Sequence, residues 1–451
     1  MPTALGVVFL VFAAWFFWRG KGRLFGFLIF TSIFGAASAL NLGSSGLQPY
    51  YFVGCIYLLS QYKHLNLPQK SLFPGARPLF LFVIVGVMTA IICPRLFAGL
   101  PVYSPTISID EGLLYRPPLE PGFSNIVQSA FLILNCLILI AASREKRSKH
   151  IDRFYDFAFY FLTSIIFIQF LLIALHISAD PFSFLRNNKG YSIAATQDSN
   201  SARLSGTFSE PSGVGIALVI FFGGYLRRFF TRSEARGRLL LSIVAIGLTR
   251  STSTIAATAL IVGWMLVCNP PFRFPWYIRV RRMMLIVTVF LVPLLVIFSP
   301  LKRIFGAVTI NKVGSESFVS RLTADLYALH ILIATHFLGS GLGSNRPSSL
   351  ITSLLSTVGI LGAAAFAWMV FSILRSVKGK DVSWIGWALA AGVLDMCFGG
   401  PDINQPLIWA AMALAVYYGN AGDAIPPIHE LRARAASETL SPDIGNPSPS
   451  N

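Results

Sequence analysis

The segment RLSGTFSEPSG, residues 203–213, combines residue types that could bind an anion. Arg203 has a planar guanidinium that can hold two phosphate oxygens at once, and Gly206 allows a close approach of the backbone. Glu210 and Pro211 have the pattern of a helix start. Because a helix start exposes backbone N–H groups, it can also bind a diphosphate. The segment is therefore a well-formed helix start beside a solvated arginine, a diphosphate site, or both.

A second candidate region combines a helical pattern with basic residues. Apolar residues recur at helical spacing over residues 321–335, which predicts an amphipathic helix lying on a membrane surface. Arg321 and Asp325 fall four residues apart on its polar face. Their simplest interpretation is an exposed ion pair of little energetic weight. The glycine-rich stretch 339–343 predicts a mobile loop, and Arg346 follows just before the next expected helix.

Two further charged residues fall within or beside apolar segments, where ionisable groups are costly and usually functional. Arg250 lies inside the apolar stretch 239–268, and Asp395 lies near the end of the apolar run 384–399. The simpler expectation is a structural ion pair between Arg250 and Asp395. The alternative is that Arg250 is an additional phosphate ligand.

The elements that position these residues must be membrane helices. Hydrophobic residues make up 54% of the 451 residues and charged residues only 12%, against about 25% charged residues in soluble domains. The five cysteines are isolated from one another in apolar segments, so we predict neither a disulfide framework nor a metal site.

Apolar runs of spanning length predict an all-α polytopic fold with about 12–13 transmembrane helices. The stretch 239–268 is too long for one upright helix and has basic clusters at both ends, so we expect a helical hairpin turning near Arg250. Residues 1–420 then form a single multi-pass domain, and 421–451 a disordered cytoplasmic tail. The other runs lie near residues 2–18, 24–42, 46–60, 79–93, 123–142, 154–178, 211–226, 283–299, 349–374, 384–399 and 406–419.

Charge distribution orients these spans. With the N-terminus outside and the C-terminus in the cytoplasm, most of the 36 Lys and Arg residues fall in short cytoplasmic turns, as the positive-inside rule requires. The formal charge of +17 is then mainly a topology signal, and no nucleic-acid partner is expected. Three outer regions are long, at about 94–122, 179–210 and 300–348, and the first is rich in proline and is expected to pack as a cap.

Three patterns occur in an order that resembles a known family. RLSGTFSEPSG is followed by LTRSTSTIAATAL at 248–260, and the stretch from Arg321 through GSGLG leads to LSTVGILG at 355–362. Together they resemble the O-antigen ligase and Wzy-type polysaccharide polymerase superfamily, most strongly over about 200–375. The resemblance implies a GT-C-like glycosyltransferase of the bacterial inner membrane that needs neither metal nor cofactor. Its substrate would be an oligosaccharide on a polyprenyl diphosphate carrier, used at the outer face of the bilayer.

The resemblance also implies roles for individual residues. Arginines of the outer loops hold the diphosphate in this family, and the matching positions here are Arg203 and Arg321. Such guanidinium groups would stabilise the negative charge that develops on the diphosphate as the sugar–phosphate bond breaks. Glu210 or His336 would assist the acceptor hydroxyl as a general base.

One departure from the family pattern bears on the reaction. Ligases carry a His, then Asn, Ser or Gln, nine residues, and Gly-x-x-Gly; here Gly359 and Gly362 match, but Ser348 stands at the His position. A serine cannot replace an imidazole as a base near neutral pH, so the departure favours a polymerase. Further candidates for substrate binding are Arg250, Arg346, Gly206, Ser348 and Asp395.

The sequence therefore favours polymerisation of polyprenyl-diphosphate-linked repeat units into a surface polysaccharide or exopolysaccharide. Expected partners are the lipid bilayer, the lipid-linked oligosaccharide, a flippase and a chain-length regulator. Two alternatives stay open: a ligase that transfers finished glycan to an acceptor, and a flippase or transporter of lipid-linked glycan.

Overall fold

The part of the chain that the structure describes is mostly α-helical. The computed structural model describes residues 1–42, 45–65, 73–104, 115–148, 150–177, 180–188, 204–232, 235–268, 316–380 and 382–420. Three predictions fall outside these ranges: Arg203, the span at 283–299 and the tail from 421 onward.

Thirteen α-helices lie within the described ranges. The first six are α1 (Ala4–Arg19), α2 (Lys21–Thr31), α3 (Pro49–Leu65), α4 (Ala76–Leu96), α6 (Phe123–Ala142) and α7 (His150–Ala174). The next three are α8 (Pro211–Arg232), α9 (Arg236–Thr249) and α10 (Thr252–Cys268). The last four are α15 (Glu316–Ala334), α16 (Leu350–Val377), α17 (Ser383–Gly399) and α18 (Pro406–Asn420). A 3-10 helix, η1, covers Ser183–Arg186.

Five of these helices are long and apolar enough to cross a membrane: α4, α6, α7, α8 and α16. Three others are apolar but shorter, namely α1, α10 and α17. These helices are consistent with a multi-pass membrane protein. Among the described residues, fewer helices have spanning length than the 12–13 that we predicted.

One predicted span is wrong. The apolar run 24–42 does not form one helix, because α2 ends at Thr31 and the chain continues through turns into strand β1 (Leu40–Leu42). Strand β1 pairs antiparallel with β2 (Ser45–Leu47). The prediction of an all-α fold therefore misses a two-stranded sheet of three residues per strand.

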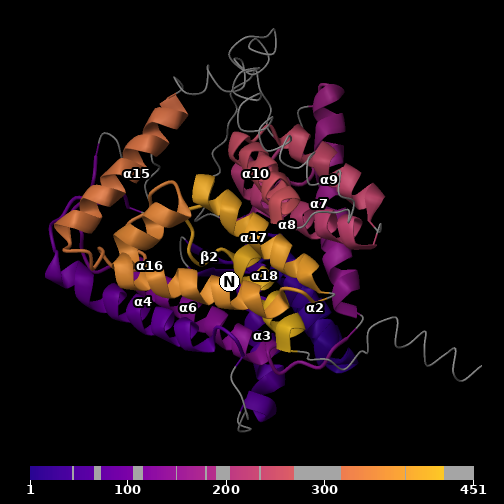
Figure 1. Ribbon diagram of the computed structural model, residues 1–451, viewed down its shortest axis with the longest axis horizontal. Helices are drawn as coiled ribbons and strands as arrows, with labels where there is room; N and C mark the ends of the chain where they lie inside the picture. Colours follow the sequence, from indigo (N-terminus) through magenta and orange to yellow (C-terminus); the bar gives the residue numbers. More distant parts are fainter. Residues whose placement is uncertain are drawn as a thin grey trace, which may run out of the picture.

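The centre of the bundle is α18, between the helices that Figure 1 shows around it. Every residue from Pro406 to Tyr418 is buried, which is the pattern of a helix enclosed on all sides. The most extensive packing in the bundle is between α8 and α17. Gly223 of α8 allows it, since a Cβ there would lie 2.7 Å from the Trp387 carbonyl oxygen of α17. This packing fixes the N-terminal end of α8 relative to the C-terminal end of α17.

The stretch 239–268 is broken where the hairpin was predicted. Helix α9 ends at Thr249, Arg250 adopts a left-handed conformation with φ 52°, and α10 begins at Thr252. After the break, α9 packs on α8 and α7, whereas α10 packs on α8 and α17.

The glycine-rich stretch 339–343 is held firmly, so the prediction of a mobile loop is wrong. Helix α16 is interrupted at Gly359, where φ is +69°, and this leaves carbonyls of the preceding turn without helical partners. The N–H groups of Ser340 and Gly341 bind the carbonyls of Ser356 and Thr357 at 2.7 and 2.9 Å. The Ile360 N–H in turn binds the Phe337 carbonyl at 3.1 Å.

The proline-rich region 94–122 packs as a cap over α15 in its described parts. Its two sides are joined by backbone bonds, such as Val102 N–H to the Pro117 carbonyl at 3.0 Å. Arg116 lies over the ring of Tyr327 from α15, 3.7 Å from its centre. The cap and α15 also share a small buried cluster of Val102, Leu119 and Ile331.

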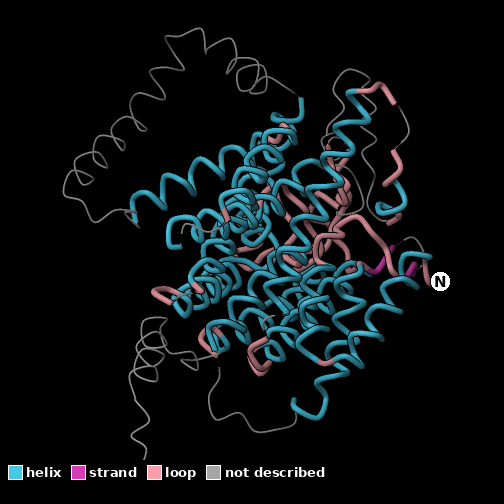
Figure 2. Tube along the Cα trace, turned by 90° about the vertical axis from the view of Figure 1, so that its right-hand side faces the viewer, coloured by secondary structure: helices cyan, strands magenta, loops and turns pink. Residues whose placement is uncertain are grey.

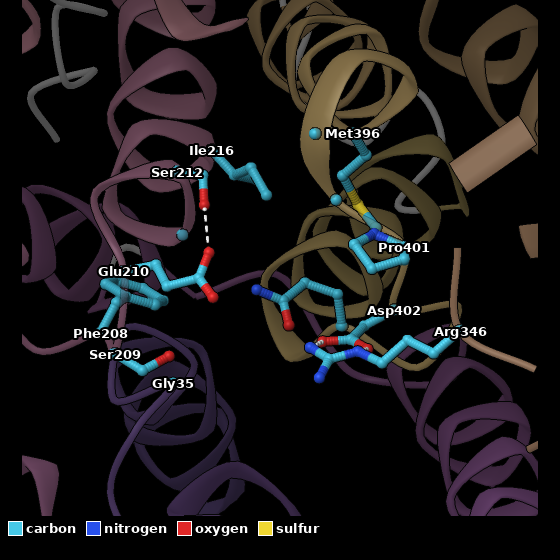
Figure 3. Close-up of a pocket in the computed structure, with 14 residues that line it drawn as sticks. Gly35, Phe208, Ser209, Glu210, Ser212, Ile216, Arg346, Met396, Pro401 and Asp402 are labelled. Carbon is cyan, nitrogen blue, oxygen red and sulfur yellow. Dashed lines mark hydrogen bonds and ion pairs between the residues drawn. The ribbon is translucent and has the colours of Figure 1, made fainter. Parts of the chain in front are cut away.

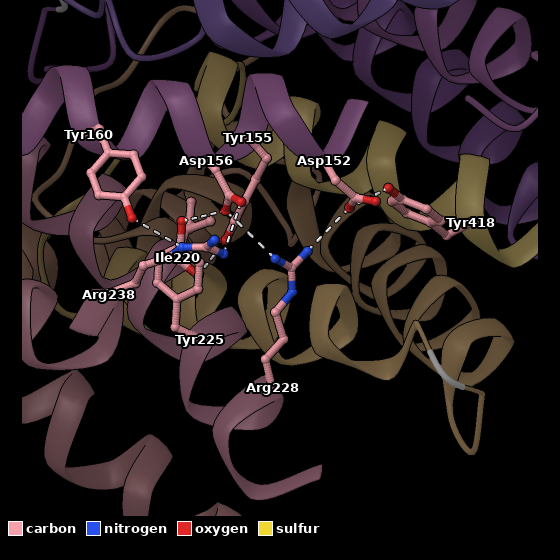
Figure 4. A network of polar contacts seen from close by, with 9 residues as sticks. All are labelled: Asp152, Tyr155, Asp156, Tyr160, Ile220, Tyr225, Arg228, Arg238 and Tyr418. Carbon is pink, nitrogen blue, oxygen red and sulfur yellow. Dashed lines mark hydrogen bonds and ion pairs between the residues drawn. The ribbon is translucent and has the colours of Figure 1, made fainter. Parts of the chain in front are cut away.

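A polar network closes the opposite end of the bundle, where α7 begins and α8 ends (Figure 4). Arg228 of α8 pairs with Asp152 at 3.2 Å and Asp156 at 3.6 Å, and it stacks 3.7 Å over the ring of Trp384. Arg238 binds Asp156 at 2.9 Å from the other side. Figure 2 shows the same bundle turned by 90°.

Candidate anion site at the N-terminal end of α8

A charged pocket lies at the end of α8 that is far from Arg228. Its volume is about 540 Å³ when the open space at its mouth is included. The residues that line it are Gly35, Phe208, Ser209, Glu210, Ser212, Gly213, Ile216, Arg346, Met396, Gly399, Gly400, Pro401, Asp402 and Gln405. In Figure 3, Glu210 and Ser212 face Arg346 and Asp402 across this space. The pocket therefore combines segments that are distant in the sequence.

Glu210 lies at the start of α8 and forms one wall. Its backbone carbonyl accepts the N–H groups of Gly213 and Val214 at 3.1 and 3.4 Å, which begins the helix. Its carboxylate accepts a hydrogen bond from Ser212 Oγ at 3.0 Å. The side chain is about half exposed, at 49%, so it is accessible to a ligand in the pocket.

Arg346 and Asp402 form the opposite wall. Arg346 Nε lies 3.3 Å from Asp402 Oδ1, and its Nη2 lies 3.4 Å from Oδ2. This is the two-pronged geometry that a guanidinium also offers to phosphate. The Arg346 N–H binds the carbonyl of Tyr103 at 2.9 Å, so the proline-rich cap fixes the backbone at Arg346.

The turn that carries Asp402 is held in place by the buried side-chain amide of Asn404. Asn404 donates to the Gln128 carbonyl and side-chain oxygen at 2.9 and 2.8 Å. The Tyr51 hydroxyl binds the Asn404 carbonyl, and Asn135 donates to its side chain at 3.3 Å. Asp402 is thus presented by a rigid turn, which is what a preorganised site requires.

Arg321 reaches the same pocket from α15. Its Nη2 lies 3.9 Å from the Glu210 carboxylate. A Cβ added to Gly399, which lines the pocket, would lie 3.5 Å from Arg321 Nη1 and 3.4 Å from Ser253 Oγ. The guanidinium of Arg321 and the hydroxyl of Ser253, at the start of α10, therefore both border the pocket beside Gly399.

The structure places Glu210 and Arg346 on the lining of one pocket, with the Arg321 guanidinium 3.9 Å from the Glu210 carboxylate. Arg250 is exposed in the turn three residues before Ser253, and it is not among the residues that line the pocket. Arg203 lies outside the described residues, but the segment that follows it is firmly held. Leu204 is buried, and Phe208 forms part of the pocket wall.

Gly206 faces away from the pocket. Its φ is +58°, and its N–H donates to Gln169 Oε1 of α7 at 3.0 Å. A Cβ there would lie 3.2 Å from side-chain atoms of Leu162 and Val214. The close backbone approach predicted at Gly206 is therefore made to neighbouring helices.

The predicted ion pair between Arg321 and Asp325 is wrong. Asp325 instead binds the start of α16, where it accepts hydrogen bonds from Ser348 N at 2.9 Å and Ser349 N at 3.2 Å. Ser348 Oγ also donates to Asp325, at 2.7 Å. Ser348 is buried at 6% exposure, so its hydroxyl belongs to this contact and not to the pocket.

His336 lies beyond the other end of α15. The helix ends at Ala334, and thirteen residues of helical rise from Arg321 correspond to about 20 Å. The ring is exposed and lies 6.4 Å from the ring of Phe97. This geometry favours Glu210 over His336 as the base near the pocket.

The expected ion pair between Arg250 and Asp395 is also wrong. Asp395 is 1% exposed, and its Oδ2 accepts a hydrogen bond from Thr254 Oγ1 at 3.4 Å. Its Oδ1 has no hydrogen-bond partner among the described residues. Arg250 is exposed in its turn, so burial of Asp395 separates the two charges.

Sequence patterns missed Asp402, Gln405 and Ser253 as pocket residues. The motif GGPDINQP begins four residues after Asp395, and its charged and amide side chains were a usable signal. Within the described ranges, no three His, Cys, Asp or Glu side chains gather as they would around a metal ion.

The described helices form a bundle, consistent with a multi-pass membrane protein, in which Arg346, Glu210 and Asp402 line one pocket and Arg321 lies at its rim. In comparisons with known proteins, the chain matches no family model, and no curated protein matches it either.

Proposed function

We propose that this protein transfers glycan from a polyprenyl diphosphate carrier to a hydroxyl of a second, carrier-linked unit, and so lengthens a surface polysaccharide. The reaction would take place at the outer face of the bacterial inner membrane, as in the Wzy-type polymerases that the sequence resembles. The observation that carries the proposal is the pocket in which the paired Arg346 and Asp402 lie opposite Glu210, with the Arg321 guanidinium at the rim, 3.9 Å from the Glu210 carboxylate.

The pocket suits the chemistry of this transfer. The acceptor oxygen attacks the anomeric carbon, the bond to the diphosphate oxygen breaks, and the diphosphate leaves with the electron pair. Arg321 and Arg346 would stabilise the charge on the leaving group. Glu210 would take the proton from the acceptor hydroxyl.

Polymerisation is favoured over ligation by the environment of Ser348. The position where ligases carry His here holds a buried hydroxyl, which is hydrogen-bonded to Asp325 and to the carbonyl of Arg321. A side chain held in this way cannot act as the base of a ligase. A null mutant that accumulates single repeats supports polymerisation, whereas full-length polymer left on its carrier supports ligation.

A flippase or transporter is the alternative of another class, and Asp395 is the observation that favours it. A carboxyl buried within a helical membrane region often marks an ion or substrate pathway. The pocket and the network around Arg228 lie toward the two ends of the described bundle. Translocation of lipid-linked glycan by reconstituted protein, without any extension, would favour the transporter.

The proposal is tested by chain length in cells. In strains carrying Arg321→Ala or Arg346→Ala, we expect surface polymer to shorten to single or few repeats. Arg95→Ala is the matched control, because Arg95 is an exposed arginine of α4 whose guanidinium contacts the Ile91 carbonyl and does not line the pocket. Normal polymer in both pocket variants, at normal protein levels, would remove the anion-binding role.

A further inference from the structure

Asp325 makes an unusually complete set of contacts with the start of α16. Its Oδ1 accepts hydrogen bonds from the N–H groups of Ser348 and Ser349, at 2.9 and 3.2 Å, and from Thr352 Oγ1 at 2.7 Å. Its Oδ2 accepts the Ser348 hydroxyl at 2.7 Å. The carboxylate thus binds four donors, three from the two residues just before α16 and one, Thr352 Oγ1, from its first turn.

A carboxylate is the group that this position favours. The first N–H groups of a helix have no partners within it, and the helix dipole places partial positive charge there. An asparagine side chain has one acceptor oxygen where the carboxylate has two, and it lacks the negative charge. Replacing Asp325 by Asn therefore weakens the contact without removing its volume.

Arg321 lies one turn before Asp325 on the same helix and is coupled to the same contact. The Ser348 hydroxyl lies 3.3 Å from the Arg321 carbonyl as well as 2.7 Å from the Asp325 carboxylate. Beyond that point the Arg321 guanidinium extends to the pocket beside Gly399, 3.9 Å from the Glu210 carboxylate. The docking of α15 on α16 thus determines where this guanidinium lies.

We propose that Asp325 is a positioning residue, which fastens α15 to the N-terminus of α16 and thereby holds Arg321 at the pocket. Its effect on the reaction rests on the proposed function, whereas the docking of the two helices does not.

The experiment compares Asp325→Asn, Asp325→Glu and Ser348→Ala with the wild type in lipid nanodiscs. Ser376→Ala is the matched control, because Ser376 Oγ binds only a local helix carbonyl, that of Ile373, at the far end of α16 as the structure describes it. Two quantities are measured: hydrogen exchange of the amides from Ser348 to Thr352, and kcat and KM with a synthetic polyprenyl-diphosphate-linked oligosaccharide. Both are repeated in an Arg321→Ala background.

We expect Asp325→Asn to accelerate exchange of these amides about tenfold or more, and Ser348→Ala to do so less. KM for the donor should rise about tenfold, because Arg321 binds the diphosphate, and kcat should fall as well, because Arg321 also stabilises the charge on the leaving group. Asp325→Glu keeps the negative charge, so its effects on amide exchange and on KM should be smaller than those of Asp325→Asn. In the Arg321→Ala background, Asp325→Asn should change KM little further, because Asp325 affects the donor through the position of Arg321.

Unchanged amide exchange in Asp325→Asn would overturn the docking, and so would an equal effect in the Ser376→Ala control. Faster exchange with unchanged KM, or additive effects of the two variants, would show a purely structural role and overturn the positioning. If the wild type transfers no glycan, the proposed function fails on its own, and the exchange measurement still decides whether Asp325 docks α16.

Discussion

In the pair of Arg346 and Asp402, the carboxylate of one residue orients the guanidinium of the other. Both side chains are a little over one third exposed, at 38% and 37%, so the pair contributes little to stability. Its value lies in orientation, since the carboxylate holds the guanidinium plane across the pocket from Glu210. A diphosphate would meet a guanidinium that is already oriented, which lowers the entropic cost of binding.

This orientation makes a prediction for Asp402→Asn. The amide cannot hold both guanidinium nitrogens, so KM for the diphosphate-linked donor should rise about three- to tenfold, which corresponds to roughly 1 kcal/mol. Arg346→Lys should have a larger effect, because an ammonium group lacks the fork. Steady-state kinetics measure both. An unchanged KM in Arg346→Lys would contradict the two-pronged contact.

Glu145, at the opposite end of the bundle from the pocket, should make the stability of the protein depend on pH. It lies between α6 and α7, and Gln61 and Tyr57 donate to its carboxylate. Burial raises the pKa of the Glu145 carboxyl, although these bonds and the nearby Lys21 lower it in part. The folded protein therefore binds this proton more tightly than the unfolded chain does.

The free energy of unfolding should then fall as pH rises from the carboxyl's ordinary pKa, about 4.3, through the raised value in the folded protein. Glu145→Gln removes this loss and keeps an acceptor oxygen for Gln61. We expect the variant to unfold at a higher temperature than the wild type at pH 7, with the difference shrinking toward pH 4. A thermal-shift series over pH measures this. A difference that grows toward acid pH would contradict the assignment.

Among the elements, α16 depends most on one backbone break. At Gly359 the φ of +69° is one that residues with a Cβ adopt at a cost, and a Cβ there would lie 2.3 Å from the Phe337 carbonyl oxygen. The unpaired carbonyls before the break bind the loop that leads to Arg346. The break therefore positions the pocket as well as the helix.

Gly359→Ala should destabilise the protein by about 2 kcal/mol or more, through strain and loss of the loop contacts. Gly263→Ala is the matched control, because Gly263 lies within α10 and a Cβ there would meet no atom within 4 Å. That substitution should be neutral or stabilising by up to about 1 kcal/mol. Denaturation in the same detergent compares the two. Equal stability of both variants would contradict the account of the break.

The elements also show what a sequence can predict. Apolar runs located α4, α6, α7, α8 and α16, because the hydrophobic pattern is a local property. The break at Arg250 was predicted from length and flanking charge. The partner of Asp325 was not, because the start of α16 lies more than twenty residues further along the chain. Likewise the glycines of 339–343 suggested a mobile loop. The carbonyls of α16 that bind this loop lie further along the chain, so a local sequence pattern does not reveal them.

At the scale of the whole molecule, the two polar regions lie at opposite ends of α8. Ser212 lines the pocket, and Arg228 joins the other network, sixteen residues later or about 24 Å of helical rise. That distance approaches the thickness of a hydrocarbon core. The predicted topology places the pocket end outside and the Arg228 end in the cytoplasm.

Two cysteine substitutions at exposed positions test this orientation. A membrane-impermeant maleimide should label Glu120→Cys, in the proline-rich cap, in intact cells. It should label Lys146→Cys, between α6 and α7, only after the cells are permeabilised. The unsubstituted protein controls for its own cysteines. The reverse pattern would place the pocket in the cytoplasm and contradict the proposed reaction.

The site was predicted from sequence only in its parts. Arg321 was predicted from the resemblance to the polymerase and ligase superfamily, whereas Glu210 and Arg346 were predicted from their residue types beside expected helix starts. Their meeting at one pocket, and the contribution of Asp402, depend on the packing of α8 against α17. That packing is a property of the whole bundle and has no signature in any single segment.

The central claim is tested most directly by the purified protein with a synthetic polyprenyl-diphosphate-linked repeat unit, with the products separated by size. We predict a ladder of products that grows one repeat at a time in the wild type, with and without a metal chelator. The ladder should be lost in Arg346→Ala and kept in Arg95→Ala. No extension by the wild type, or an unaltered ladder in Arg346→Ala, would contradict the proposed role of the pocket.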